Sequence, residues 1–335
     1  MNYPQLSIVI PAYNEEDNIP RLYTELVEVL EKSTAWEVIL VDDGSTDSTW
    51  QKITTLNQQD GRIRGLRFSR NFGHQYALFA GLSHARGQAV ITMDADLQHP
   101  PQLITKLIVE WEKGNKVVNA IRLDPDDFSV AKRITSRIFY KMFSFLSGVH
   151  LQKGMADFRL LDRQVVHHIL QFGEEGLFLR GIIQWVGFPN SQIAFHCNNR
   201  FSGHSKYTLR KMLRFGITGI TSFSIVPLRL GIIVGIITSI IAFYHLAYAV
   251  YAKLILEATV PGWATTISIL SFMFGILFIL IGLVGEYIGR ILIEVRSRPR
   301  FIISEQLGFY SDAQYGSQSL NFNDSKLPFY EKDVM

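Results

Sequence analysis

The sequence predicts an α/β protein in which a mostly parallel sheet domain is followed by interfacial helices and two transmembrane helices. Two observations carry this prediction. In the N-terminal part, short apolar runs alternate with segments of helical periodicity, which is typical of a parallel sheet with helices on both faces. Toward the C-terminus, two stretches without any charged residue each exceed the ~20 residues that cross a bilayer.

The expected strands are short apolar runs bounded by turn and breaker residues. They cover Leu6–Pro11, Trp36–Val41, Ile63–Phe68, Ala89–Met93 and Lys116–Ile121. Helices are expected between them. The first carries Ile19, Leu22, Leu26, Val29 and Leu30 at helical spacing, the second begins near Ser45 or Asp47, and the others cover Asn71–Ala85 and Gln102–Glu112.

The pattern changes after the fifth strand. An acidic loop over Leu123–Phe128 precedes a basic amphipathic helix over Val130–Leu146, which is expected to lie either on a membrane surface or on the sheet. A second interfacial helix is expected over Thr208–Ser222, and the tail from Ser304 is polar and expected to be irregular. The transmembrane helices are expected within Leu230–Ala252 and Gly262–Gly285.

Charge distribution predicts the membrane orientation. Basic residues cluster before the first expected span and after the second, whereas the loop between them holds one lysine and one glutamate. This bias places both termini in the cytoplasm. Four regions are therefore expected: a cytoplasmic α/β domain (1–205), a juxtamembrane interfacial helix (206–228), a two-helix transmembrane hairpin (229–289) and a cytoplasmic tail (290–335).

Composition excludes several classes. No apolar run opens the chain, so no signal peptide is expected, and the lone Cys197 excludes an intramolecular disulfide. A net charge of +3 is too small to indicate nucleic-acid binding. The dinucleotide fingerprint, the P-loop and the zinc-protease motif are all missing from the sequence.

Acidic residues follow the fourth expected strand. Asp94 and Asp96 leave its C-terminal end, which in open α/β sheets is where ligands bind. Two carboxylates there are compatible with Mg²⁺, which takes one or two protein carboxylates and completes its shell with water and phosphate oxygens. The alternative is a solvated Asp-rich turn. Because Asp42–Ser45 and Pro11–Glu16 follow two neighbouring strands, the three strand ends together predict a nucleotide pocket.

Six segments carry a resemblance to a known family: IVIPAYNEE, VDDGSTDST, SRNFG, DADLQHPP, DFRLLDR and RFSGHSKY. In this order they resemble inverting family-2 glycosyltransferases of the GT-A fold. The closest resemblance is to membrane polyisoprenyl-phosphate glycosyltransferases, similar to dolichyl-phosphate mannose synthase and the bacterial undecaprenyl-phosphate glucosyltransferases. It extends to about Arg300, the two expected spans included.

The resemblance implies a role for each matching residue. The nucleotide sugar would contact Pro11, Tyr13, Glu15, Asp42, Asp43, Asp94, Gln98 and Arg122. A Mg²⁺ or Mn²⁺ ion would be held by Asp94, Asp96 and Gln98. Asp157 would act with Asp96 in catalysis, and the lipid phosphate would bind Arg200 and Lys206.

Other interpretations of single residues stay open. Asp157 could pair with Arg159 or Arg163, Arg122 could be a solvated charge, and Tyr13 could simply pack. No role is expected for His74, His99, His167 and His168.

The resemblance implies metal-dependent, inverting transfer of a hexose, with UDP-glucose favoured, to a polyisoprenyl phosphate such as undecaprenyl phosphate. The enzyme would be integral to the membrane, with its catalytic domain on the cytoplasmic face of a bacterial inner membrane. The acceptor phosphate is already mostly ionised near pH 7. Asp157 is therefore expected to have a positioning role as readily as a proton-accepting one.

Three alternatives remain: a GDP-mannose-dependent mannose synthase, a processive polysaccharide synthase and an inactive nucleotide-sugar-binding protein. The polysaccharide synthase is disfavoured because Gln184–Trp185 lacks the Gln-x-x-Arg-Trp spacing. A homo-oligomer is left open.

Overall fold

The structure is a computed structural model that describes residues 5–31, 35–123, 154–174, 176–196, 226–255, 262–296 and 298–309. The described residues form two compact units. One is an α/β unit that contains all the described strands together with helices α1–α4, α6 and α7. The other contains the long C-terminal helices α9 and α10.

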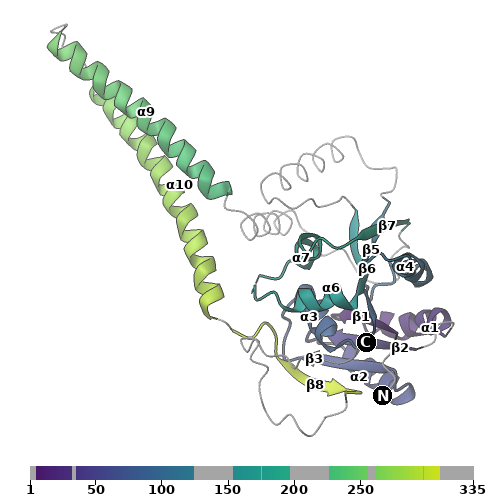
Figure 1. Cartoon of the computed structure of the whole chain (residues 1–335). Helices are drawn as coiled ribbons and strands as arrows, with labels where there is room; N and C mark the ends of the chain where they lie inside the picture. The colour runs from purple at the N-terminus through teal and green to yellow at the C-terminus, as the bar shows by residue number, and fades with distance from the viewer. Residues whose placement is uncertain are drawn as a thin grey trace, which may run out of the picture. The chain divides into compact units, whose positions relative to one another are not determined.

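The α/β unit is built on one sheet, in which the described residues supply eight strands in the order β7-β5-β6-β4-β1-β2-β3-β8 (Figure 1). The strands are β1 (Leu6–Ala12), β2 (Trp36–Asp42), β3 (Ile63–Phe68), β4 (Ala89–Thr92), β5 (Val117–Arg122), β6 (Met155–Asp162), β7 (Asn190–Phe195) and β8 (Ile303–Leu307). All five expected strands are present, each within about two residues of its expected bounds.

The sheet is mostly parallel, as expected. Parallel pairs join β1 to β2, β1 to β4, β2 to β3 and β5 to β7. The antiparallel pairs are β4 with β6, β5 with β6, and β3 with β8. The last pair corrects the expectation for the tail. Residues from Ser304 onward are not irregular throughout, because 303–307 form an edge strand.

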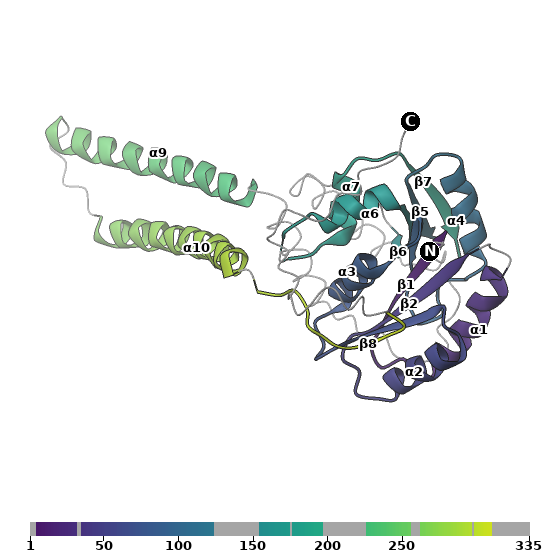
Figure 2. The same cartoon turned by 60° about the horizontal axis from the view of Figure 1, so that its bottom comes forward.

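The helices cover both faces of the sheet (Figure 2). They are α1 (Asn18–Leu30), α2 (Thr49–Gln59), α3 (His74–His84), α4 (Leu103–Glu112), α6 (Arg163–Leu170) and α7 (Leu179–Trp185). Helices α1, α2 and α4 pack on one face, and α3, α6 and α7 lie on the other.

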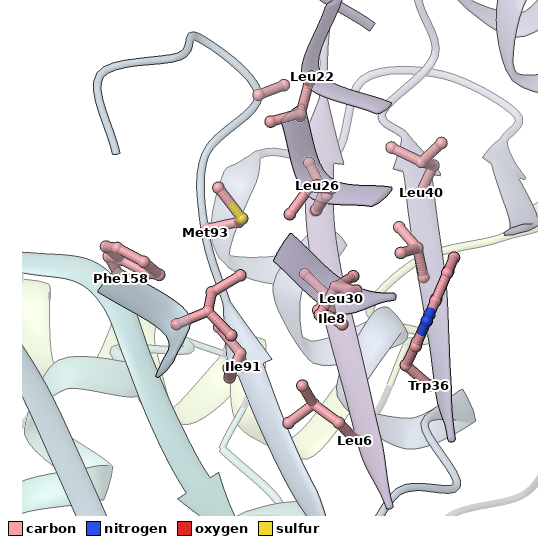
Figure 3. Packing of buried hydrophobic residues seen from close by; sticks show 14 of the residues in the cluster. Leu6, Ile8, Leu22, Leu26, Leu30, Trp36, Leu40, Ile91, Met93 and Phe158 are labelled. Atoms are coloured by element: carbon pink, nitrogen blue, oxygen red, sulfur yellow. The ribbon is translucent and has the colours of Figure 1, made fainter. Parts of the chain in front are cut away.

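The main apolar core lies between the sheet and helices α1, α2 and α4. Figure 3 shows Leu22 and Leu26 of α1 against Ile8 of β1 and Leu40 of β2. These side chains are at most 4 % exposed. Alternate residues of each strand enter this core because strand side chains point to opposite faces in turn. The core therefore fixes the register of the strands whose ends carry the predicted site.

Strand β6 was not expected as a strand, and its position matters for function. It lies between β4 and β5 and runs antiparallel to both, with Arg159 opposite Thr92. Its N-terminal end therefore meets the C-terminal end of β4. This brings Asp157 of β6 to the edge of the sheet where Asp94 follows β4.

The second unit is a helical hairpin of α9 (Val226–Leu254) and α10 (Trp263–Arg296). Within the described part of the chain, two segments are long and apolar enough to span a membrane: Leu228–Tyr248, with a mean hydropathy of 2.1, and Thr266–Arg296, with a mean hydropathy of 2.8. They coincide with the two expected spans. Helix α10 continues to Arg296, beyond the C-terminal end of the second expected span at Gly285.

Several expected features lie outside the described residues. These are most of the acidic loop 123–128, the amphipathic helix 130–146 and the interfacial helix 208–222. The lipid-phosphate residues Arg200 and Lys206 also belong to this group.

Candidate active site

The loops that follow β1 and β2 are fastened to each other. The backbone N–H of Asn14 donates to Ser45 Oγ at 2.9 Å, and that of Glu15 donates to Thr49 Oγ1 at 2.9 Å. In return, Asn14 Oδ1 accepts the N–H of Thr46 at 2.9 Å. Asn14 adopts a φ of 56°, a conformation that asparagine tolerates better than most residues. The two strand ends thus form one rigid platform.

Asp42 lies at the end of β2 and is fully buried. Its Oδ1 accepts the N–H of Ser45 at 2.8 Å, and Arg67 Nε lies 3.5 Å from Oδ2. Within the described residues, Oδ2 accepts no hydrogen bond. Burial raises the pKa of Asp42, although the hydrogen bonds from Ser45 and the charge of Arg67 oppose that rise. A buried acceptor without a donor is suited to a ligand hydroxyl or N–H.

Asp43 holds the loop that leads into α3. Its carboxylate accepts the N–H of Phe72 at 2.7 Å and that of Gly73 at 2.9 Å. Burial raises the pKa of Asp43, and these two bonds oppose the rise. Because the loop is fixed in this way, α3 begins at His74 and not at Asn71 as expected. The predicted contact of Asp43 with the nucleotide stays a prediction.

The remaining residues predicted for the nucleotide surround this platform. Pro11 is buried in β1, whereas Tyr13 is 37 % exposed in the following loop. Glu15 Oε2 accepts a hydrogen bond from Asn18 Nδ2 at 2.5 Å. Arg122 is exposed at the end of β5, where its N–H donates to Gly154 O at 2.8 Å.

Asp94, Asp96 and Gln98 follow β4 and are partly exposed, in alternation with buried neighbours. Asp96 Oδ1 accepts the N–H of Gln98 at 3.1 Å, and Leu97 between them has a φ of 60°. The N–H of Asp94 donates to His99 Nδ1 at 3.1 Å. Since that nitrogen accepts, the proton of a neutral His99 is on Nε2, which lies 3.8 Å from Asp94 Oδ2.

This donor set fits a divalent cation. Asp94 Oδ1 is buried and accepts no hydrogen bond from the described residues, which is costly for a carboxylate. Among the described residues, no group of three or more His, Cys, Asp and Glu side chains is arranged to hold a metal ion by itself. An ion on Asp94 and Asp96 would therefore complete its shell with water and phosphate oxygens, as Mg²⁺ commonly does.

Asp157 is held by two arginines. Arg180 of α7 forms a two-point contact, with Nε 2.9 Å from Oδ1 and Nη2 2.9 Å from Oδ2. Arg159 Nη2 donates to Oδ1 at 2.9 Å. Of the two alternative pairings left open for Asp157, the one with Arg159 is present, whereas Arg163 donates from Nε to the carbonyl of Gly87 at 2.8 Å.

The charges around Asp157 determine its protonation. Burial alone would raise the pKa of Asp157, but the charge of Arg180, the hydrogen bonds from His74 and Arg180, and the charge of Arg159 hold that pKa well below its usual range. Burial lowers the pKa of Arg159 to about 10, although the charge of Asp157 opposes the shift. Asp157 is thus a stable anion near neutral pH.

His74 and Arg180 are site residues that sequence reasoning missed. His74 Nε2 lies 3.4 Å from Asp94 Oδ1 and 3.5 Å from Asp157 Oδ2, so it joins the acidic pair of β4 to the cluster on β6. Burial alone would lower the pKa of His74, but Asp157 and Asp94 raise it. A signal for Arg180 existed, since it is the single charged residue in the otherwise apolar segment LRGIIQW.

Acidic residues at the carboxyl ends of β1, β2 and β4, with an ionised aspartate beside them, lie at the edge of the sheet where open α/β folds bind ligands. Comparison with known families identifies the enzyme class. Residues 7–170 match the model of Glycosyl transferase family 2, and residues 226–291 match the GtrB C-terminal hairpin. The chain belongs to glycosyl transferase family 2 and is a glycosyltransferase.

Curated relatives match nearly the whole chain. An uncharacterized glycosyltransferase, YkcC, of Bacillus subtilis (strain 168) is 37 % identical over 95 % of this chain and 98 % of its own. The SfII prophage-derived bactoprenol glucosyl transferase of Shigella flexneri is 38 % identical over 90 % of this chain and 98 % of its own. The expected family and enzyme class are confirmed.

One solved structure that matches the chain is distant from it in sequence. Glucosyl-3-phosphoglycerate synthase from Mycobacterium tuberculosis, in complex with Mn²⁺ and UDP-glucose, is 17 % identical with a TM-score of 0.46. It covers 65 % of this chain and 77 % of that chain. At this level of similarity nothing is transferred from its ligands.

Proposed function

We propose that this glycosyltransferase moves a hexose from a nucleotide sugar, with UDP-glucose favoured, to a polyisoprenyl phosphate at the cytoplasmic face of a membrane. The observation that supports the proposal is the cluster at the end of β4, where His74 lies between Asp94 and the ionised Asp157 and Asp96 follows two residues after Asp94. Relatives named bactoprenol glucosyl transferases, which match both the α/β unit and the apolar hairpin, support the choice of sugar and acceptor.

The platform of the first two strand ends would hold the nucleoside. Asp42 Oδ2 offers a buried acceptor for a base or ribose donor. Tyr13 offers an exposed aromatic ring, and it directly follows Ala12, which pairs with Asp42 across β1 and β2. The loops carrying them are joined by side-chain to backbone hydrogen bonds, so the platform is in place before a ligand binds.

Asp94, Asp96 and Gln98 would hold Mg²⁺ or Mn²⁺, and such an ion supplies Lewis-acid neutralisation of a leaving diphosphate. Arg122, exposed at the end of β5, would share the phosphate charge through charge-assisted hydrogen bonds. Arg200 and Lys206 are proposed to receive the acceptor phosphate.

Asp157 would hold neighbouring side chains in position and would not abstract a proton. An aspartate whose pKa lies well below its usual range binds a proton poorly, and a phosphate monoester with a second pKa near 6 needs little help to ionise at pH 7. A single displacement by the ionised acceptor would invert the anomeric centre. Asp157 would keep Arg180 and His74 in place at the reacting edge of the sheet.

The test is a product assay with the purified full chain, Mg²⁺, undecaprenyl phosphate and a panel of nucleotide sugars. We expect one glycolipid whose mass equals undecaprenyl phosphate plus a hexose, formed from UDP-glucose and lost on addition of EDTA. A product formed only from GDP-mannose would overturn the choice of donor. Transfer unaffected by EDTA would overturn the metal site.

A further inference from the structure

The chain returns to the α/β unit after α10. Residues 299–309, here called the return segment, lie along β3 at the edge of the sheet. Phe301 stacks on Phe68 with ring centroids 5.0 Å apart, and Ile302 O accepts the N–H of Ser69 at 3.0 Å. Strand β8 within the return segment then pairs antiparallel with β3, with Glu305 opposite Arg67.

Glu305 makes side-chain contacts in addition to the backbone pairing of β8 with β3. Its Oε1 lies 2.6 Å from Arg67 Nη1, and its Oε2 accepts a hydrogen bond from Trp50 Nε1 at 3.0 Å. Both bonds lower the pKa of Glu305, so it is ionised near neutral pH. One carboxylate therefore fixes Arg67 of β3 and Trp50 of α2 together.

Arg67 in turn lies beside Asp42, which belongs to the platform formed by the ends of β1 and β2. Its Nε lies 3.5 Å from Asp42 Oδ2, which is longer than a well-formed N–H···O hydrogen bond. Asp42 is fully buried, and this oxygen accepts no hydrogen bond from the described residues. The charge of Arg67 thus acts on Asp42 while no hydrogen bond from the described residues occupies its Oδ2.

The short contact between Arg67 and Glu305 explains why Arg67 does not come closer to Asp42 Oδ2. A guanidinium that lies between two carboxylates is held in the position where it forms the stronger, shorter charge-assisted hydrogen bonds. Without Glu305, Arg67 would either close onto Asp42 Oδ2 and occupy it or turn into solvent. In the first case the acceptor is lost, and in the second Asp42 loses the charge that offsets its burial.

We propose that Glu305, in the return segment after the second apolar helix, is a positioning residue for the nucleotide donor that acts through Arg67 on Asp42. The inference rests on the proposed function, in which Asp42 contacts the nucleoside. It assigns to the return segment a part in donor affinity, beyond closing the edge of the sheet.

The test compares Glu305→Gln with Glu110→Gln in the full chain. Glu110 of α4 forms an ion pair of the same length, 2.6 Å, with Lys113 at the C-terminal end of that helix. Binding of UDP in the presence of Mg²⁺ is measured by calorimetry. Donor KM and kcat are measured by the product assay.

We expect Glu305→Gln to raise the Kd for UDP and the donor KM about three- to tenfold, because a short charge-assisted bond is lost at a half-exposed site. We expect kcat to change less than about twofold, since Arg67 touches no reacting atom. Glu110→Gln should leave the UDP Kd unchanged. In an Arg67→Gln background, Glu305→Gln should have no further effect.

Equal UDP affinity in Glu305→Gln and Glu110→Gln would overturn the inference, as would a full additional loss in the Arg67→Gln background. Asp42→Asn separates the role of Glu305 from the proposed function. If it leaves UDP binding unchanged, the proposed nucleoside pocket is wrong. If it weakens binding while Glu305→Gln does not, only the role of Glu305 is wrong.

Discussion

Asp157 is the residue whose environment says most about the chemistry. It is 9 % exposed and bears hydrogen bonds from Arg159 and Arg180, with His74 beside it. Each of these neighbours stabilises the carboxylate and not the carboxylic acid. A carboxylate in this environment holds the cationic side chains around it in place, which is a different role from accepting a proton.

A first prediction compares two aspartates by rate. Asp157→Asn leaves Arg159 buried without its counter-charge, so we expect a loss of about 3–5 kcal/mol in unfolding free energy. The protein that remains folded should still transfer sugar at a measurable rate. Asp96→Ala should lose nearly all transfer, because a ligand of the proposed cation is removed. Initial rates per folded molecule decide the matter, and the opposite ranking would make Asp157 the essential group.

A second prediction concerns pH. With its pKa well below the usual range, Asp157 stays ionised from pH 5 to 8, so its titration adds no limb to the rate profile there. The acceptor monoester, with a second pKa near 6, should instead set the acidic limb. We expect kcat/KM for the lipid to fall about tenfold from its plateau by pH 5, because only about a tenth of the phosphate is then dianionic.

The same limb should persist in Asp157→Asn, at a lower plateau. If the acidic limb disappeared in this variant while the wild type retained it, Asp157 would be titrating and would act as the base. A limb that only moved would instead report His74, whose pKa Asp157 raises. The profile is measured with saturating donor, so that donor binding does not contribute.

At the same scale, the sequence identified the acidic residues but not their neighbours. Asp94, Asp96 and Asp157 belong to recognisable segments, and the structure places His74 between Asp94 and Asp157. His74 itself carries no sequence signal, since isolated histidines are commonly structural. Its role depends on a loop conformation that Asp43 fixes through two backbone N–H groups.

At the scale of elements, β6 explains why the site could be only partly predicted. The sequence pattern yields five strands in parallel order, whereas β6 inserts antiparallel between β4 and β5. A charged pair, Asp157 and Arg159, interrupts its apolar alternation. Those charges are buried because they neutralise each other, a pairing that periodicity alone does not reveal.

Gly44 gives a third prediction, for the loop after β2. It has a φ of 69°, and a Cβ there would meet the backbone of Arg70 and Asn71. Gly44→Ala should therefore push apart the two loops that flank Asp43. We expect lower stability, by about 1–3 kcal/mol, and weaker UDP binding, because both the backbone conformation and the loop contact are strained.

The matched control is Gly61→Ala in the turn before β3, where a Cβ would meet nothing within 4 Å. This variant should bind UDP like the wild type. Thermal unfolding and UDP calorimetry on both variants check the prediction, and equal behaviour of the two would show that the loop tolerates displacement.

At the scale of the whole molecule, hydropathy identified the apolar hairpin but not the strand after it. The prediction of the two spans depends on composition, which can be judged from a local stretch of sequence. The return segment is short, and β8 is exposed at most of its positions, so it resembles a polar tail. It becomes a strand because the edge of β3 offers unpaired backbone groups, a feature that only the folded sheet supplies.

A final prediction concerns membrane orientation. Helix α10 has 34 residues, and at about 1.5 Å per residue it is longer than a hydrocarbon layer of about 30 Å. Its charged C-terminal turns, where Glu286 pairs with Arg290 at 3.0 Å, should therefore leave the hydrocarbon on the side that carries the basic residues. The α/β unit should lie on that side, in the cytoplasm, and the connection between α9 and α10 on the other.

The measurement uses a Cys197→Ser background with one cysteine introduced at a time. Thr259→Cys, between the two helices, should react with a membrane-impermeant maleimide in intact spheroplasts. Lys113→Cys, whose native side chain is 61 % exposed on α4, should react only after lysis. The reverse labelling would place the nucleotide platform outside the cell, away from cytoplasmic nucleotide sugars. A donor site on that side would have no substrate, so the orientation tests the proposed reaction as well as the topology.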